Sequence, residues 1–190
     1  FHWWVPRPEV TPQPKEGEVI VFSDHINRGF STPGSKFFRD VLNFFQLHPQ
    51  DIGPNSVSNI CNFQVFCEVY LQEEPSVDLF IEYYYLNRQT EFTNGPSLEL
   101  GGISIQRRRY AIFPSGALPS HPKDWNQTWF YYQDTSRSYE NPLPGFRDCR
   151  LGPKHPLPDR ISTAEWAKYM ATFSKVRALL ANWLTEVDLV

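Results

Sequence analysis

The sequence predicts an α+β fold, with three aromatic-rich helices forming the core, a small antiparallel sheet and a long C-terminal helix. Two observations predict this class. Apolar residues recur at steps of three and four in the first half of the chain and at its C-terminal end, and short apolar runs bounded by turn residues lie between. Aromatic residues make up 16% of the chain, and their large rings suit a heavy core or an adhesive surface.

The composition is that of a folded domain. Hydrophobic residues make up 41% and charged residues 21% of the 190 positions, which fits neither a disordered nor a membrane protein. A net charge of −3 argues against a protein that coats nucleic acid throughout, but leaves a local basic patch open. No apolar stretch approaches the roughly 20 residues that cross a bilayer, and no signal peptide is recognisable. We expect an intracellular protein, in the nucleus or the cytoplasm.

The cysteines and the methionine lead to two further expectations, about the state of the thiols and about the extent of the chain. Cys61, Cys67 and Cys149 match no zinc-binding spacing, so we expect reduced and mainly buried thiols. The chain starts at Phe1 and its one methionine is Met170, which indicates a piece of a longer protein.

Residues 1–16 read as an extended, proline-rich arm. Trp3 and Trp4 stand near its start, and two adjacent indoles are costly to leave in water, so we expect the arm to lie against the domain or a partner. Residues 18–22 then form a short apolar run, which predicts a strand. The prolines of the arm are Pro6, Pro8, Pro12 and Pro14.

Three helices are expected next. Residues 35–47 show helical apolar spacing, with Ser35 as N-cap and an end before Pro49. Residues 56–72 follow Asn55 as N-cap, and their apolar residues cover most of the circumference, so this helix should be central. Residues 77–87 follow Ser76 as N-cap. The apolar positions of the central helix are Val57, Ile60, Cys61, Phe63, Val65, Phe66, Val69 and Tyr70.

The second half of the chain changes character. Residues 102–106, 110–113 and 128–132 read as strands of one small antiparallel sheet packed on the helices. Residues 136–160 hold five prolines and read as an ordered, irregular strap.

Residues 161–190 predict an amphipathic helix that begins with the capping box of Ser162 and Glu165. Its apolar residues alternate at steps of three and four, which is a heptad seam suited to packing on the chain's own domain, on a partner, or on a second copy. The seam consists of Trp166, Tyr169, Phe173, Val176, Leu180, Trp183 and Val187.

No pattern of catalytic or cofactor-binding residues is recognisable. The glycine pair at 101–102 lacks the clustered glycines of a phosphate-binding loop, and no nucleophile elbow occurs. Asp24 follows a predicted strand, as a carboxylate of a metal-dependent nuclease or transposase would, but no converging set of carboxylates accompanies it. We therefore expect no enzyme, cofactor, metal or small-molecule substrate, and keep the metal-dependent enzyme as a remote alternative.

Arg107, Arg108 and Arg109 form a local basic cluster, and Trp125 and Trp129 are aromatic residues that follow it in the sequence. Arginines bind phosphates and indoles stack on unpaired bases, so this combination indicates weak non-specific or single-stranded nucleic-acid binding as an alternative function. A hairpin turn with solvated arginines and a buried aromatic face explains the same pattern.

Several segments in succession resemble one family. They are residues 19–25, 28–31, 37–42, 48–55, 59–63, 66–71 and 125–131. Together they closely resemble the gypsy-type transposon domain of plants, notably grasses, over about residues 17–135. The resemblance implies a protein derived from a mobile element, with no established active site to carry over. Longer members commonly continue into coiled coils, which agrees with the heptad seam.

The sequence therefore favours a non-enzymatic protein–protein interaction or structural module. The residues expected to contact a protein partner or a second copy are those of the seam, with the Trp3–Trp4 arm as a second candidate.

Overall fold

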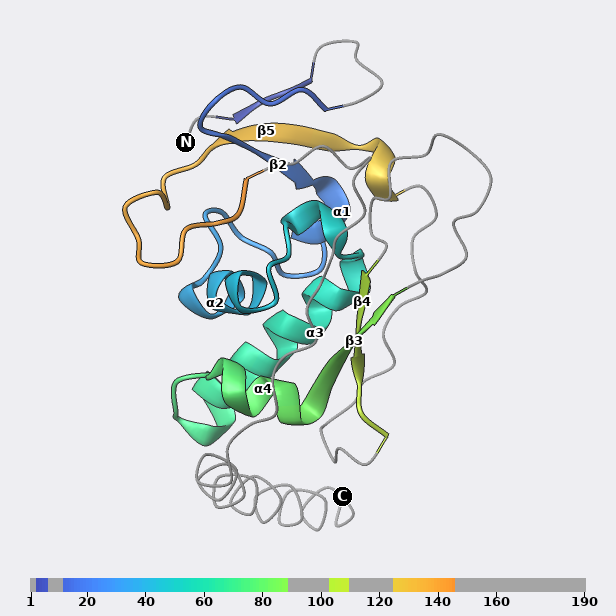
Figure 1. Ribbon diagram of the computed structural model, residues 1–190, viewed down its shortest axis with the longest axis vertical. Helices are drawn as coiled ribbons and strands as arrows, with labels where there is room; N and C mark the ends of the chain where they lie inside the picture. Colours follow the sequence, from blue (N-terminus) through green and yellow to red (C-terminus); the bar gives the residue numbers. More distant parts are fainter. Residues whose placement is uncertain (1–2, 7–11, 89–102, 110–124, 146–190) are drawn as a thin grey trace, which may run out of the picture.

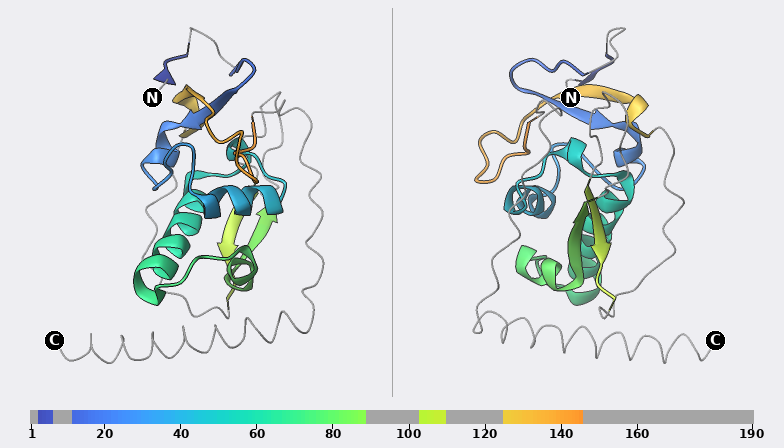
Figure 2. Two further views of the ribbon diagram at one scale, coloured as in Figure 1. Left: turned by 90° about the vertical axis from the view of Figure 1, so that its left-hand side faces the viewer. Right: turned by 45° about the vertical axis from the view of Figure 1, so that its right-hand side comes forward.

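The computed structural model describes residues 3–6, 12–88, 103–109 and 125–145. A three-stranded sheet lies at one end of the molecule, and helices α2, α3 and α4 lie beneath it with a two-stranded ribbon beside α3 (Figures 1 and 2). The mixture of helices, small antiparallel sheets and an aromatic core confirms the expected α+β class over these residues. No helix among them is both long and apolar enough to span a bilayer.

The three-stranded sheet has the order β1-β5-β2, with every pair antiparallel. Strands β2 (Glu18–Phe22) and β5 (Trp129–Gln133) confirm two predicted strands to within a residue. Strand β1 is Trp3–Trp4 and pairs with β5, so the start of the arm does lie against the domain. The ring of Trp3 packs on those of Phe130 and Tyr132, at centroid distances of 4.3 and 5.0 Å.

The second sheet is a ribbon of β3 (Tyr84–Arg88) and β4 (Ile103–Arg107). Strand β4 confirms the strand expected at 102–106, but the prediction of a helix through residue 87 and of one common sheet was wrong. Helix α4 (Val77–Tyr83) stops at Tyr83 because the β-favouring residues from Tyr84 onward find a strand partner in β4. Propensity alone does not show where such a partner becomes available.

Helix α2 (Lys36–Phe44) begins as predicted, with the Ser35 hydroxyl accepting the amide of Phe38 at 3.1 Å. It ends three residues earlier than expected. Gln46 takes a positive φ of 53°, the amide of Gln46 bonds the carbonyl of Asn43, and that of Leu47 bonds the carbonyl of Leu42. This is a Schellman closure, in which the two leucines are buried together.

Helix α3 (Pro54–Val65) continues into a π-helix, η2 (Phe66–Leu71). The predicted N-cap at Asn55 was wrong. Gly53 occupies that position and Pro54 the first helical one, where a missing amide costs nothing and the fixed φ suits the helix. The predicted N-cap of α4 is confirmed, since the Ser76 hydroxyl accepts a hydrogen bond from the amide of Leu79 at 3.2 Å.

The core is centred on Phe63 of α3. Its ring packs against rings from α2, α4 and β3 at centroid distances of 5.2 to 6.2 Å. The contacting rings are those of Phe37, Phe80, Tyr83 and Tyr84. The expected aromatic-rich core of three helices is thus confirmed, with β3 as an additional wall.

Three short elements connect these parts: helix α1 (Ser23–Ile26) and the 3-10 helices η1 (Pro49–Asp51) and η3 (Trp125–Gln127). The first ten residues of the expected strap, 136–145, fold back onto α2. The predicted strand at 110–113, the rest of the strap and the helix at 161–190 lie outside the described residues.

Candidate protein-interaction surface

Large apolar side chains are exposed where α3 passes into η2. Val65 is 50% exposed, Val69 61% and Tyr70 62%. Helices α1 and α2 and strand β4 contact other sides of α3, and the Phe63 ring also packs on Phe80 of α4. Ile60, Phe63 and Phe66 are buried. The sequence had placed all of these residues in one central, covered helix, and for the three exposed ones that interpretation was wrong.

The π-helical geometry accounts for the position of Tyr70. In a regular α-helix Phe63, Cys67 and Tyr70 would share one face. A π-helix bonds residue i to residue i+5, so each residue advances the chain by a smaller angle and Tyr70 is rotated away from the core. Its ring stacks on that of Phe66 at 5.9 Å, and η2 ends at Gln72 with a φ of 54°. Such turns are rare in proteins, and those that occur are often found at functional sites.

A small pocket adjoins the exposed residues. It has a volume of about 170 Å³ and lies between α3 and the loop that precedes α2. Gly29 permits the close approach of this loop to the helix, because its φ is +100° and a Cβ there would lie 3.1 Å from Cβ of Cys61. The lining residues are Gly29, Phe30, Ser31, Ser35, Phe38, Cys61, Gln64 and Val65.

The chemistry of the pocket is mainly apolar. Burial raises the pKa of the Cys61 thiol to about 11, so the group stays neutral and behaves as a small apolar side chain. The Ser35 hydroxyl donates to Oε1 of Gln64, and Nε2 of Gln64 donates to Oε1 of Glu68 at 2.7 Å. One wall therefore offers fixed polar atoms, and Val65 connects the pocket to Val69 and Tyr70. We call these three residues and the pocket the α3–η2 surface.

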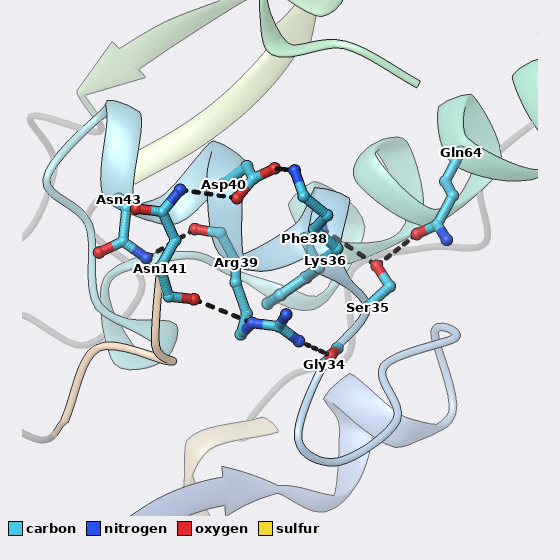
Figure 3. A network of polar contacts seen from close by, with 9 residues as sticks. All are labelled: Gly34, Ser35, Lys36, Phe38, Arg39, Asp40, Asn43, Gln64 and Asn141. Atoms are coloured by element: carbon cyan, nitrogen blue, oxygen red, sulfur yellow. Dashed lines mark hydrogen bonds and ion pairs between the residues drawn. The ribbon is translucent and has the colours of Figure 1, made fainter. Parts of the chain in front are cut away.

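A polar network holds the walls of this surface in place (Figure 3). The guanidinium of buried Arg39 donates to the carbonyls of Gly34 and Asn141, and lies 4.4 Å from the ring centroid of Tyr139. Asn43 donates to the carbonyls of Arg39 and Pro142 at 2.8 Å each. The loop before α2, α2 itself and residues 139–142 are thereby fixed to one another.

The basic cluster is located on the ribbon. Arg107 ends β4 and is exposed, as is Arg109 in the following turn. Arg108 points back, since its Nε donates to the carbonyl of Ile81 at 2.9 Å and its backbone amide to that of Tyr83 at 2.7 Å. Arg107 and Arg109 are thus the exposed members of the cluster, and Arg108 is held against the end of α4.

The two tryptophans proposed to accompany the arginines lie at the three-stranded sheet, Trp129 in β5 and Trp125 in η3 beside β2. Trp125 of η3 is buried, its ring stacked on His25 at 5.1 Å and edge-on to Phe22 at 4.9 Å. Trp129 begins β5 opposite Phe22 and is half-buried. Its indole nitrogen is buried without a hydrogen-bond partner among the described residues.

Asp24 and His25 follow β2 in helix α1. Asn27 donates to the Asp24 carboxylate at 3.4 Å. The His25 ring is buried and its Nε2–H donates to the carbonyl of Ile52 at 3.0 Å, while burial lowers its pKa to about 3. Within the described part of the chain no three His, Cys, Asp or Glu residues lie together as metal ligands would.

The seven seam residues from Trp166 to Val187 lie outside the described residues. The sequence did not identify Val65, Val69 and Tyr70 as a surface, because an apolar residue in a helix that is apolar all round carries no mark of the side left uncovered. Glu68, placed among them, was the one available signal.

Comparison with known proteins relates part of the chain to a protein family. Residues 19–88 match the family model described as "Putative gypsy type transposon", which covers β2 through β3 and includes the whole α3–η2 surface. The match agrees with the expected family over a shorter range than residues 17–135. No curated protein and no solved structure matches the chain.

Proposed function

We propose that the chain is a non-enzymatic protein-interaction module of a transposon-related protein, and that its α3–η2 surface binds an amphipathic helix. The observation that carries this proposal is the exposure of Val65, Val69 and Tyr70 beside an apolar pocket. Burying apolar surface is worth about 25 cal/mol per Å², so such a group of side chains favours a covered state. The transposon-related part of the proposal rests on the match at residues 19–88.

The shape of the surface indicates a helical ligand. Val65 and Val69 stand one turn apart along α3–η2, and the pocket lies beside Val65. An amphipathic helix lying along this line would place apolar residues at i, i+3 or i+4 against the valines, with one larger side chain in the pocket. The polar atoms of Ser35 and Gln64 at the pocket wall would limit how that side chain is oriented.

A selection from a displayed library of helical peptides tests the proposal without a known partner. Peptides selected on the whole chain should be amphipathic. They should bind Val69→Glu at least about tenfold more weakly, since a charge then faces their apolar side. The matched control is Val5→Glu, at a valine that is 84% exposed, and it should leave binding unchanged.

Two results would contradict the proposal. One is a selection that enriches no helical peptide. The other is a set of enriched peptides that bind wild type, Val69→Glu and Val5→Glu equally, because they would then recognise another part of the chain.

A second candidate function is weak nucleic-acid binding by the ribbon. It is favoured by the exposure of Arg107 and Arg109 at one end of β4. Affinity for single-stranded DNA should then fall steeply as the salt concentration rises. The double variant Arg107→Gln, Arg109→Gln should have a shallower slope of log affinity against log salt, as expected for the loss of about two phosphate contacts. Binding that is unaffected by the substitutions would reject this candidate.

A further inference from the structure

The part of the α3–η2 surface that α3 and η2 supply lies in a stretch of the chain with charge of one sign, whereas Arg28 and Lys36 adjoin the pocket residues Gly29 and Ser35. Residues 41–87 contain no Lys and no Arg, but six acidic residues: Asp51, Glu68, Glu73, Glu74, Asp78 and Glu82. Glu68, Glu73 and Glu74 are exposed beside the apolar side chains. The first two are close enough to Cys67 to add to the effect of burial in raising its pKa. A ligand that contacts the η2 end of this surface therefore meets negative charge beside the apolar side chains.

The chain that follows Gly145 supplies a basic connecting segment and then apolar residues at helical spacing. Residues 146–160 contain four basic and two acidic residues, and residues 161–190 contain three of each. Residues 161–190 carry the predicted apolar seam, with Arg177 next to Val176 at its edge. A predicted helix with an apolar seam, preceded by a segment of net positive charge, is a ligand of the kind that this surface favours.

The connection is long enough for this segment to reach the surface. The described chain ends at Gly145, whose carbonyl is bonded to Nδ1 of His48, close to the end of α2. Fifteen residues, 146–160, separate it from the predicted helix. An extended chain of that length spans about 50 Å. The segment has to pass along α2, from its His48 end to the pocket at its Ser35 end, and the nine residues of α2 extend only about 13 Å. Tethering at this range gives an effective concentration of the order of millimolar, which favours an intramolecular contact.

We propose that residues 161–190 bind, through the seam, to the α3–η2 surface of the same chain. This inference rests on the proposed function only in that both use that surface. The chain then contains its own competitor, and an external helix has to displace it. The apolar periodicity of the segment and its attachment to the domain by fifteen residues identify it as the occupant. The attachment favours it over the same segment of a second copy or an unrelated helix.

The test uses a labelled synthetic peptide of residues 146–190 and the full chain. In wild type the surface is occupied, so the peptide should bind weakly. In the double variant Phe173→Asp, Leu180→Asp the chain's own seam is disabled, and the peptide should bind at least about tenfold more tightly. Adding Val69→Glu to the double variant should remove that gain, while adding Val5→Glu should preserve it. Binding to the double variant should also weaken as salt rises.

Circular dichroism and thermal unfolding of each variant establish that the domain remains folded. Equal binding by wild type and the double variant overturns the inference, because the surface is then not occupied in cis. Light scattering that shows a concentration-dependent wild-type dimer, lost in the double variant, also overturns it in favour of exchange between copies.

The two proposals fail in different ways. If the double variant does not bind the peptide but still binds the displayed helices in a Val69-dependent manner, the inference about the segment is wrong and the proposed function stands. If Val69→Glu alters the binding of neither ligand, the proposed function itself is wrong.

Discussion

The burial of His25 makes the stability of the fold depend on pH. Its neutral ring is packed between Trp125 and Phe22, and its Nε2–H donates to the carbonyl of Ile52. A proton on this ring would be buried in apolar surroundings, which is why its pKa falls from 6.5 to about 3. The ring joins helix α1 to the chain after η1 and serves the fold.

The lowered pKa predicts acid sensitivity. Below about pH 6.5 the unfolded chain takes up a proton that the folded chain refuses until about pH 3, so the unfolding free energy should decrease as the pH falls through this window. For this group the slope approaches about 1.4 kcal/mol per pH unit. Urea unfolding at several pH values measures this slope. The variant His25→Gln lacks the titrating group, so its slope should be smaller by the contribution of about one proton. An identical slope in the variant would contradict the assignment.

Arg39 is the second residue with a disproportionate role. Its guanidinium donates to two backbone carbonyls, those of Gly34 and Asn141, which are far from each other in the sequence. Arg39→Met keeps the apolar stem and removes both bonds, so the unfolding free energy should fall by about 3 kcal/mol. Lys36→Met is the control, since the Lys36–Asp40 ion pair is largely exposed on its lysine side and should contribute less than about 1 kcal/mol. Equal losses in the two variants would contradict the role of Arg39 as the connection of residues 139–142 to α2.

At the scale of elements, the sequence was informative where local chemistry decides. Ser35 and Ser76 cap helices as predicted, because a hydroxyl before an apolar-periodic run has a clear local partner. The boundary between α4 and β3 was not predictable, because Tyr83, Tyr84 and Tyr85 suit either state until a distant strand supplies hydrogen bonds. Long-range pairing also decided how the strands divide into two sheets.

The π-helix was equally hidden in the sequence. A single extra residue in a turn leaves no mark in composition, yet it determines that Tyr70 is exposed. This is why the fold class and several elements of the chain could be predicted, whereas the α3–η2 surface could not. The seam and the basic cluster were visible as patterns, but the described residues include only the basic cluster.

The end of η2 makes a prediction of its own. Gln72 takes a left-handed conformation, with a φ of 54°, that costs a residue with a Cβ about 1 kcal/mol relative to glycine. Gln72→Gly should therefore raise the urea midpoint. Asn62→Gly, at an exposed position inside α3, should lower it slightly because glycine disfavours a regular helix. Shifts of the same sign would show that η2 does not end in this conformation.

At the scale of the whole molecule, one ring joins most of the core. Phe63 contacts α2, α4 and β3 from its place in α3. Phe63→Ala should lower the unfolding free energy by about 3–5 kcal/mol, as expected for a truncated buried aromatic residue. Phe44→Ala provides the control, because that ring is 44% exposed and its loss should cost far less. Comparable losses would place the centre of the core elsewhere.

The molecule as a whole combines a rigid aromatic core with one apolar face that its described residues leave open. The network of Arg39 and Asn43 fixes the loop and helix around the pocket, so the α3–η2 surface is preformed and need not be ordered on binding. The exposed Glu68, Glu73 and Glu74 at its η2 end add a preference for positively charged ligands there. The α3–η2 surface is thus preformed, apolar and acidic at one end.

Amide chemical-shift mapping with a helical peptide selected on the full chain tests that claim most directly. The largest shifts should occur in residues 61–71 and 29–35, which form the α3–η2 surface, with little change in the β3–β4 ribbon. Shifts centred on residues 103–109, or on the β1-β5-β2 sheet, would contradict it.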